Sequence, residues 1–149
     1  MSCTGFDGWI GYNTGTDGTP TWVELEPVRD VSTSASAGKA DVSDRRSKFK
    51  MSCPTLLDLE TTVTCTWVPG DTALTATRNQ FLNRTSAQWA VMDGDPATTG
   101  SEGWKFFAHV YSTDFEQPLE DGQTVQFTLS PTIDTSEDPI VYPSWLVVA

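Results

Sequence analysis

A chain of 149 residues with 38% hydrophobic and 11% aromatic residues is long enough for one domain with a modest core. Its formal net charge of −11 excludes general nucleic-acid binding, because a surface of that sign repels phosphate. No apolar run approaches the roughly 20 residues of a membrane helix, and the first residues lack the basic and apolar regions of a signal peptide. We therefore expect synthesis in the cytoplasm and no membrane partner.

Strands dominate the predicted elements, because Thr, Ser, Val and aromatic residues are abundant and runs of good helix formers are absent. Residues 1–20 are rich in Gly, Thr and Asp, and we expect an irregular or flexible segment there. A strand is predicted over 21–28. Another lies within 51–68, where apolar side chains from Leu59 to Trp67 alternate with Thr and Glu in the two-residue period of a half-buried strand.

A basic segment from Val28 to Lys50 separates these two strands. It contains six of the nine Lys and Arg residues together with three acids, which leaves +3 here and −14 in the rest of the chain. Gly38 predicts a turn, after which residues 40–43 are a candidate returning strand. The segment has too few apolar side chains for a core, so it is either an arm that docks on an acidic neighbour or a long solvated hairpin loop. The candidate arm residues are Arg29, Lys39, Arg45, Arg46, Lys48 and Lys50.

A helix is predicted over 72–83, the only convincing one in the chain. Pro69-Gly70 ends the preceding strand, and Asp71 is a good N-cap. The narrow apolar stripe of this helix predicts packing against one side of a sheet. Further strands are expected over 87–92, 104–113 and 124–129.

Six or seven strands and one helix predict a mainly β fold, either a β-sandwich or a partly closed barrel, with a flanking helix and a long inter-strand arm. We divide the chain into a flexible segment 1–20, a β domain 21–131 and a C-terminal extension 132–149. The extension ends in the apolar residues 140–149, which are either a last strand of the domain or a strand donated to a neighbour.

No constellation of side chains indicates catalysis. His109 is the only histidine, and its position in a predicted strand between aromatic residues is typical of a structural or interface residue. Glu120 and Asp121 are adjacent acids in a turn, whereas a glycosidase pair converges from separate strands. We therefore expect no enzyme activity, although a small enzyme that uses His109 is a hypothesis that the sequence leaves open.

No metal or other cofactor is expected either. Asp93, Asp95 and Glu102 share one loop, but they lack the ordered ligand spacing of an EF-hand. The three cysteines have the spacing of neither a disulfide framework nor a zinc site. We expect reduced thiols, with Cys65 buried in a strand.

Six tryptophans are the remaining anomaly of the composition. Their positions inside alternating strands favour packing in a core or a subunit interface, and the alternative is an exposed platform for carbohydrate. They are Trp9, Trp22, Trp67, Trp89, Trp104 and Trp145.

Several short motifs occur in one order between Thr21 and Pro131. They are Asp41–Phe49, Pro54-Thr55-Leu56-Leu57-Asp58, Trp67-Val68-Pro69-Gly70-Asp71, Phe81-Leu82-Asn83-Arg84-Thr85, Ala90-Val91-Met92-Asp93-Gly94, Pro118-Leu119-Glu120-Asp121-Gly122 and Val125–Pro131. In this order the chain resembles the major tail tube proteins of long-tailed bacteriophages, except that Val68 stands where the family commonly has an acid. The first 20 and last 18 residues fall outside the resemblance.

The resemblance implies a structural virion protein without catalysis. Its subunits would form hexameric rings that stack into a tube, with a fold shared by contractile tails and type VI secretion tubes. Strands from six subunits would merge into one barrel around a lumen, through which DNA passes without specific binding during genome delivery. Tape-measure, tail-terminator and baseplate or tip proteins are the partners expected of such a subunit. Its location would be the virion tail, after synthesis in the host cytoplasm.

The same resemblance implies roles for two groups of residues. The basic segment would reach the adjacent ring, in a contact that weakens with salt. The polar sides of two strands would face the lumen, where an acidic surface would let DNA slide without sticking; the candidates are Glu60, Thr62, Thr64, Gln126 and Thr128. The alternative function is a non-catalytic, adhesin-like carbohydrate-binding β-sandwich that uses exposed tryptophans.

Overall fold

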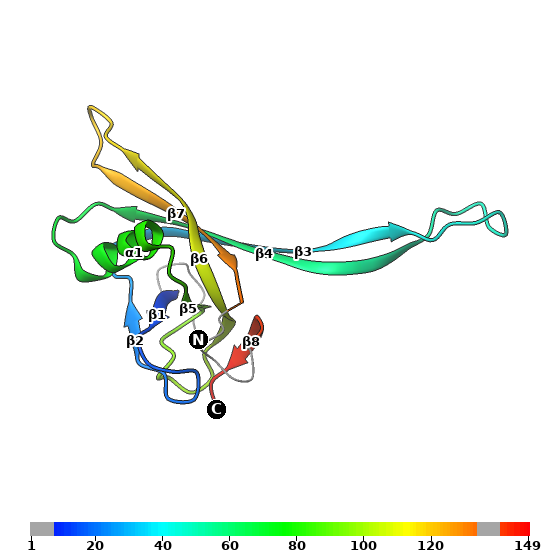
Figure 1. Cartoon of the computed structure of the whole chain (residues 1–149), viewed down its shortest axis with the longest axis horizontal. Helices are drawn as coiled ribbons and strands as arrows, with labels where there is room; N and C mark the ends of the chain where they lie inside the picture. Colours follow the sequence, from blue (N-terminus) through cyan, green and yellow to red (C-terminus); the bar gives the residue numbers. More distant parts are fainter. Residues whose placement is uncertain (1–7, 134–140) are drawn as a thin grey trace.

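The structure is a computed structural model that describes residues 8–133 and 141–149, so the expectation for Cys3 lies outside the described residues. Its elements follow one another as β1 (Trp9–Asn13), β2 (Trp22–Glu24), β3 (Val28–Asp41), β4 (Ser52–Thr66), α1 (Thr72–Asn83), β5 (Ala87–Met92), β6 (Glu102–Glu116), β7 (Thr124–Pro131) and β8 (Ser144–Val147). Figure 1 shows a body to which all of these elements contribute, and a long projection from it that β3 and β4 form.

The eight strands formed by the described residues belong to one antiparallel sheet in the order β2-β1-β5-β6-β7-β4-β3, with β8 beside β6. The long strand β6 connects the two halves of this sheet. Its first half pairs with β5 and β8, and its second half pairs with β7 after a register shift between Val110 and Ser112. The sheet does not close on itself, and α1 flanks it. The predicted class, a mainly β sandwich or partly closed barrel with one helix, is confirmed.

One hydrophobic core joins the two halves of the sheet. Ile10 of β1 and Trp89 of β5 belong to the same buried cluster as Val63 of β4 and Phe127 of β7. Strands that are far apart in the sheet order therefore contact each other through their side chains, because the sheet bends around this core. Burial of aromatic and branched side chains is the main source of stability for such a domain.

Helix α1 has the bounds that the sequence predicts. The Asp71 carboxylate accepts a hydrogen bond from the Leu74 amide at 3.0 Å, which caps the first turn, and Arg84 ends the helix in the left-handed conformation with φ of 56°. Ala73 and Leu74 enter the core beside the sheet. Within the described residues, no helix is long and apolar enough to cross a membrane.

Residues 9–13 differ from the irregular or flexible segment expected over 1–20. They form β1, which is buried along its whole length between β2 and β5. Gly11 permits this close packing, because a Cβ there would lie 2.3 Å from the Val23 carbonyl oxygen and 2.5 Å from the ring of Trp9. Gly11, one of the glycines that indicated an irregular segment, is therefore a packing requirement of a strand.

Residues 144–147 resolve the alternatives for the apolar C-terminal stretch. They form β8, which pairs with β6 inside the same chain, so this part is a last strand of the sheet. The rings of Trp104 and Trp145 pack edge to face across this pair with centroids 5.3 Å apart. Together, β1 and β8 extend the sheet beyond the predicted β domain of 21–131 at both ends.

The strand predicted over 21–28 is shorter than expected. Only Trp22–Glu24 form β2, and Val28 already begins β3. The strand must end here, because β2 and β3 lie at opposite ends of the sheet and the chain has to cross from one to the other. Leu25 anchors the crossing in the core, where it is 2% exposed.

The basic segment is a long, solvent-exposed hairpin of paired strands, but it does not turn at Gly38, and residues 40–43 do not form a returning strand. β3 and β4 are strands of 14 and 15 residues that pair from Val28 to Asp41, and the turn lies at residues 42–51. Gly38 sits at a register shift between Ala37 and Lys39, where a Cβ would meet the Thr55 hydroxyl at 2.2 Å. We call residues 34–60 the arm, because only β3 and β4 pair there, and residues 42–51 its tip.

Replacing Asp71 by Ala should lower the free energy of unfolding by about 1 kcal/mol, because the Leu74 amide loses its hydrogen-bond acceptor. Urea unfolding followed by tryptophan fluorescence measures this change. Asp71→Asn is the matched control, since an asparagine side chain also caps a helix and should keep most of the stability. Equal losses in both variants would contradict the capping role.

Candidate assembly surfaces

The five candidate lumen residues lie on one face of the sheet. Glu60, Thr62 and Thr64 occupy alternate positions of β4, and the register sets Thr62 opposite Thr128 and Thr64 opposite Gln126 on β7. Side chains of directly opposed residues point to the same side of a sheet, as do alternate residues along a strand. The role of these residues remains a prediction, but their common face is a property of the fold.

The opposite face of the same strands is the core. Exposed fractions fall to between 0% and 7% for Leu59, Thr61, Val63 and Cys65 of β4, and to 3% or less for Val125, Phe127 and Leu129 of β7. The alternation that predicted a half-buried strand is thus complete on both strands. Burial raises the pKa of the Cys65 thiol to about 12, with a smaller contribution from the carboxylate of Asp71, so this thiol stays protonated at neutral pH.

The polar face continues onto both neighbouring strands. Nine further residues on this face follow from direct pairing and from alternate positions along the strands: Asp30, Ser32, Ser34 and Ser36 of β3, Asp58 of β4, Ser112, Asp114 and Glu116 of β6, and Thr124 of β7. Side chains from β3 and β4 line one shallow groove along this face. We call the fourteen residues the polar face. It carries five carboxylates, and none of its members is a Lys or an Arg.

Two strands that border the polar face have an open edge. β3 is the last strand of the sheet and pairs only with β4. The pairing of β6 with β5 ends at Ala108, so no described strand lies on that side of its second half. The four strands β3, β4, β7 and β6 thus form a sheet that is open at both sides.

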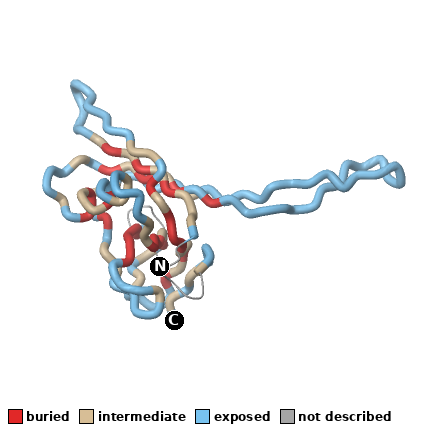
Figure 2. The backbone as a smooth tube through the Cα atoms, in the orientation of Figure 1, coloured by how far each residue is buried: buried red, intermediate tan, exposed pale blue. Residues whose placement is uncertain are grey.

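The arm extends far beyond the body. β7 pairs with β4 only over Thr61–Thr66, so the preceding residues 52–60, at 3.3 Å per residue, project by roughly 30 Å. All residues of the arm are exposed except Leu59, as the pale projection in Figure 2 shows. The tip is closed by hydrogen bonds between Ser43 and Met51.

The structure gathers five of the six predicted arm cations near the tip and leaves one apart. Lys39 and Lys50 line the same small pocket, next to Arg45, Arg46 and Lys48 in the turn. Arg29 instead lies at the base of the hairpin, at a second register shift.

Most of these cations form no ion pair within the described residues. Arg46 bonds to the Asp44 carboxylate, and this contact holds the pKa of Asp44 below its ordinary value. In the described part of the chain, Arg45, Lys48 and Lys50 take part in no ion pair.

The arm also carries exposed apolar side chains that the sequence analysis missed. Phe49, Leu56 and Leu57 have exposed fractions of 81%, 87% and 84%. The signal was present, because adjacent leucines at 56 and 57 interrupt the alternation and cannot both face the core. Exposed apolar side chains of this size on a thin hairpin indicate a surface that another molecule covers.

A second charged projection was also missed. The hairpin of β6 and β7 ends in four exposed acids, Asp114 and Glu116 at the end of β6 and Glu120 and Asp121 in the turn, and Leu119 of the turn is 100% exposed. In the sequence, Glu120 and Asp121 were considered as a catalytic pair and as part of the motif at 118–122, but not as an exposed charged surface. In the structure they are neighbours in one exposed turn, whereas the two carboxylates of a glycosidase pair converge from separate strands.

The remaining candidates for chemistry or ligand binding do not form a site. The ring of His109 lies 5.9 Å from that of Tyr111, and within the described residues the His109 side chain forms no hydrogen bond or ion pair. No group of three or more potential metal ligands occurs in this part of the chain. Five tryptophans pack within or against the hydrophobic clusters, and Trp145 is 52% exposed.

The sequence matches no protein-family model and no curated protein. Solved structures with a similar fold include a chain of the tail of an empty gene transfer agent particle with C6 symmetry, at a TM-score of 0.73 and 14% identity over 98% of this chain and 100% of that one. A chain of the SPP1 tail tube matches with a TM-score of 0.71 and 13% identity, over 97% of this chain and 78% of that one. A chain of the sheath/tube terminator of an extracellular contractile injection system matches with a TM-score of 0.66 and 12% identity, over 99% of this chain and 98% of that one. These likenesses confirm the expected fold: the chain has the architecture of tail and tube subunits.

Proposed function

We propose that this protein is a structural subunit of a tail tube, which assembles into stacked rings around a channel for DNA. The observation that carries the proposal is the polar face. An acidic, cation-free face backs directly onto a hydrophobic core, on a sheet that is open at both sides. The likeness to tail and tube structures over nearly the whole chain supports the same conclusion.

Ring formation would pair the two open edges. An unpaired strand presents free N–H and C=O groups, which favours pairing with another chain. If β3 of one copy pairs with the second half of β6 in the next, each copy adds four strands to a continuous barrel. We propose six copies in each ring, as in the gene transfer agent tail.

The polar face would line the resulting channel. Asp30, Asp58, Glu60, Asp114 and Glu116 would supply its negative charge. DNA phosphates are repelled by such a surface, so a genome can pass without binding to the wall. The net charge of −11 therefore suits a conduit for DNA.

The arm would connect neighbouring rings. Its length carries its tip well beyond the sheet that would form the barrel, and its cations would be attracted to the acidic surface of another copy. Covering Phe49, Leu56 and Leu57 would remove apolar area from water at about 25 cal/mol per Å². Charge would then direct the contact, and apolar burial would stabilise it.

The proposed role has no catalytic step. It would place the protein in a virion tail after synthesis in the host cytoplasm, with tape-measure, terminator and baseplate or tip proteins at the ends of the tube. The likeness to a sheath/tube terminator supports a place in such an assembly.

Electron microscopy of the purified protein, concentrated at low salt, tests the proposal. We expect tubes or stacked rings with a central channel. A protein that stays monomeric over wide ranges of concentration and ionic strength would contradict it.

Tube formation should protect the thiol of Cys53. This residue is exposed on the arm, whereas Cys65 is buried and its high pKa keeps it unreactive. In a Cys3→Ser variant, a thiol reagent should label one site in the free subunit and label it at least about tenfold more slowly in tubes. Equal rates in both states would mean that the arm stays uncovered.

The position of a heavy-atom label should distinguish the two sides of the sheet. In a background with Cys3→Ser and Cys53→Ser, we expect a small mercurial attached to Thr128→Cys to appear as density inside the channel wall. The matched control is Asn79→Cys, exposed on α1 beyond the core, whose label should appear at a larger radius. Averaged cross-sections of labelled tubes make the comparison, and the reverse order of radii would show that the polar face points outward.

A further inference from the structure

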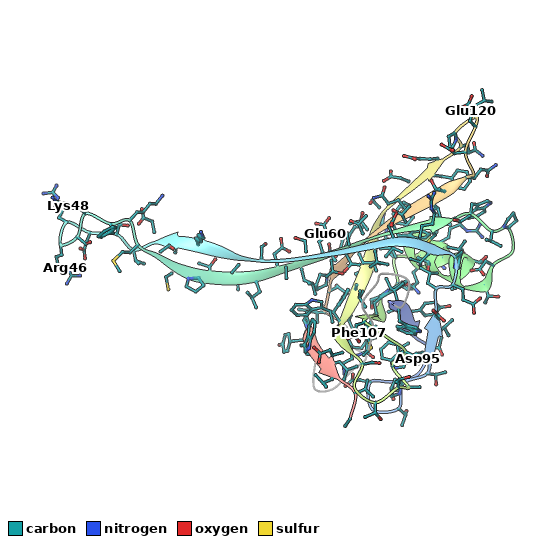
Figure 3. The ribbon with its side chains drawn as sticks, turned by 180° about the vertical axis from the view of Figure 1, so that it is seen from behind. Arg46, Lys48, Glu60, Asp95, Phe107 and Glu120 are labelled. Atoms are coloured by element: carbon teal, nitrogen blue, oxygen red, sulfur yellow. The ribbon has the colours of Figure 1, made fainter. Side chains whose placement is uncertain are left out.

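The two hairpin turns of the four-stranded sheet lie at its opposite ends. β4 and β7 are antiparallel, and Thr66 at the end of β4 faces Thr124 at the start of β7. The turn between β6 and β7 is therefore at the end of the sheet where β4 finishes, and the arm tip is at the end where β4 begins. Figure 3 shows Arg46 and Lys48 at one extreme of the molecule and Glu120 at the other.

These two ends carry opposite charge. Residues 39–50 hold five cations and two acids, a net charge of +3. Residues 114–121 hold four acids and no cation, a net charge of −4. No ion pair among the described residues uses the acids of the second group.

Each charged end also has an apolar side chain in its midst. Phe49 is 81% exposed between Lys48 and Lys50, and Leu119 is 100% exposed beside Glu120. Neither side chain can reach the core of its own chain, since each lies in a turn at the end of a projecting hairpin. Both ends therefore combine exposed apolar side chains with a net charge of one sign, and Val42, Met51 and Phe115 add to the exposed apolar area.

We propose that the acidic turn between β6 and β7 of one copy binds the basic arm tip of a copy in the adjacent ring. The inference rests on the proposed tube function and names the surface that receives the arm. Arg45 and Lys48 would oppose Glu120 and Asp121, with Phe49 and Leu119 at the centre of the contact.

The charges also determine the direction of stacking. Contacts of tip with tip or of turn with turn bring like charges together, which opposes association. Only the contact of a tip with a turn is attractive. Because these surfaces are at opposite ends of one molecule, the contact is heterologous and repeats without closing, so it propagates a filament with one polarity.

Charge reversal at each end tests the pairing. We expect Arg45→Glu with Lys48→Glu, and separately Glu120→Lys with Asp121→Lys, to raise the concentration at which tubes first appear by roughly tenfold or more at low salt. Neither variant alters the open edges or the core, so both should remain folded and form single rings. Circular dichroism, urea unfolding and electron microscopy check these points.

A mixture of the two variants is the decisive sample. In the mixture, the arm with Arg45→Glu and Lys48→Glu can bind the turn with Glu120→Lys and Asp121→Lys. The unchanged arm of the second variant can bind the unchanged turn of the first. The substituted pairs are complementary, but residues 39–50 of the reversed arm then carry a net charge of −1 and residues 114–121 of the reversed turn a net charge of 0, so this contact is weaker than the original one. An equimolar mixture should therefore form tubes in which the two kinds of ring alternate, at a lower concentration than either variant alone. The matched control is Arg78→Glu with Glu26→Lys, exposed charges outside both ends, which should assemble like the wild type.

The pairing would be overturned if either variant alone assembled like the wild type. It would also be overturned if both variants were folded and their mixture assembled no better than each variant alone. Either result would leave the tube function intact. A wild-type protein that forms no tubes under the same conditions would overturn the proposed function and this pairing with it.

Discussion

The two-residue period of β4 and β7 is the constraint on which the rest of the structure depends. Every odd position from Leu59 to Cys65 is buried, and every even position from Glu60 to Thr64 is on the polar face. A slip of one residue would bury carboxylates and expose the core, so the register is strongly specified. The helix on one side and the acidic surface on the other both follow from this division.

The same four strands account for the incomplete character of the single chain. Their apolar face is satisfied inside the subunit, but their edges at β3 and β6 are not. The arm adds exposed leucines and a phenylalanine that contribute nothing to the stability of a monomer. Assembly would satisfy the edges and cover the arm, so the modest core of one subunit need not provide the stability of the whole structure.

In the proposed assembly, the distribution of charge would let one acidic chain associate with itself. A uniform net charge of −11 would cause repulsion between copies. Concentrating cations at the arm tip creates one attractive contact without placing any cation on the polar face. The separation matters physically, because the range of exposed charges is about 10 Å at 0.1 M salt and the arm projects roughly 30 Å from the sheet.

The sequence by itself determined the elements whose signals are local. The cap at Asp71, the strands β5 and β7 and the alternation in β4 depend on residues close together along the chain, and all were predicted. It also identified the candidate lumen residues as the polar sides of two strands, because that periodicity can be read without knowing the partner strand.

Only the tertiary structure decided the features that depend on distant partners. β1 is a strand because Gly11 fits against Val23 and Trp9 under a neighbouring strand, and composition alone suggested an irregular segment. The basic segment is a strand because β4 supplies its hydrogen bonds, which offset a side-chain composition too polar to fold alone. The opposition of the arm tip and the turn at Glu120 depends on the antiparallel register of β4 and β7. Residue order sets local periodicity, but which surfaces meet or lie apart is set by contacts between segments remote in the chain.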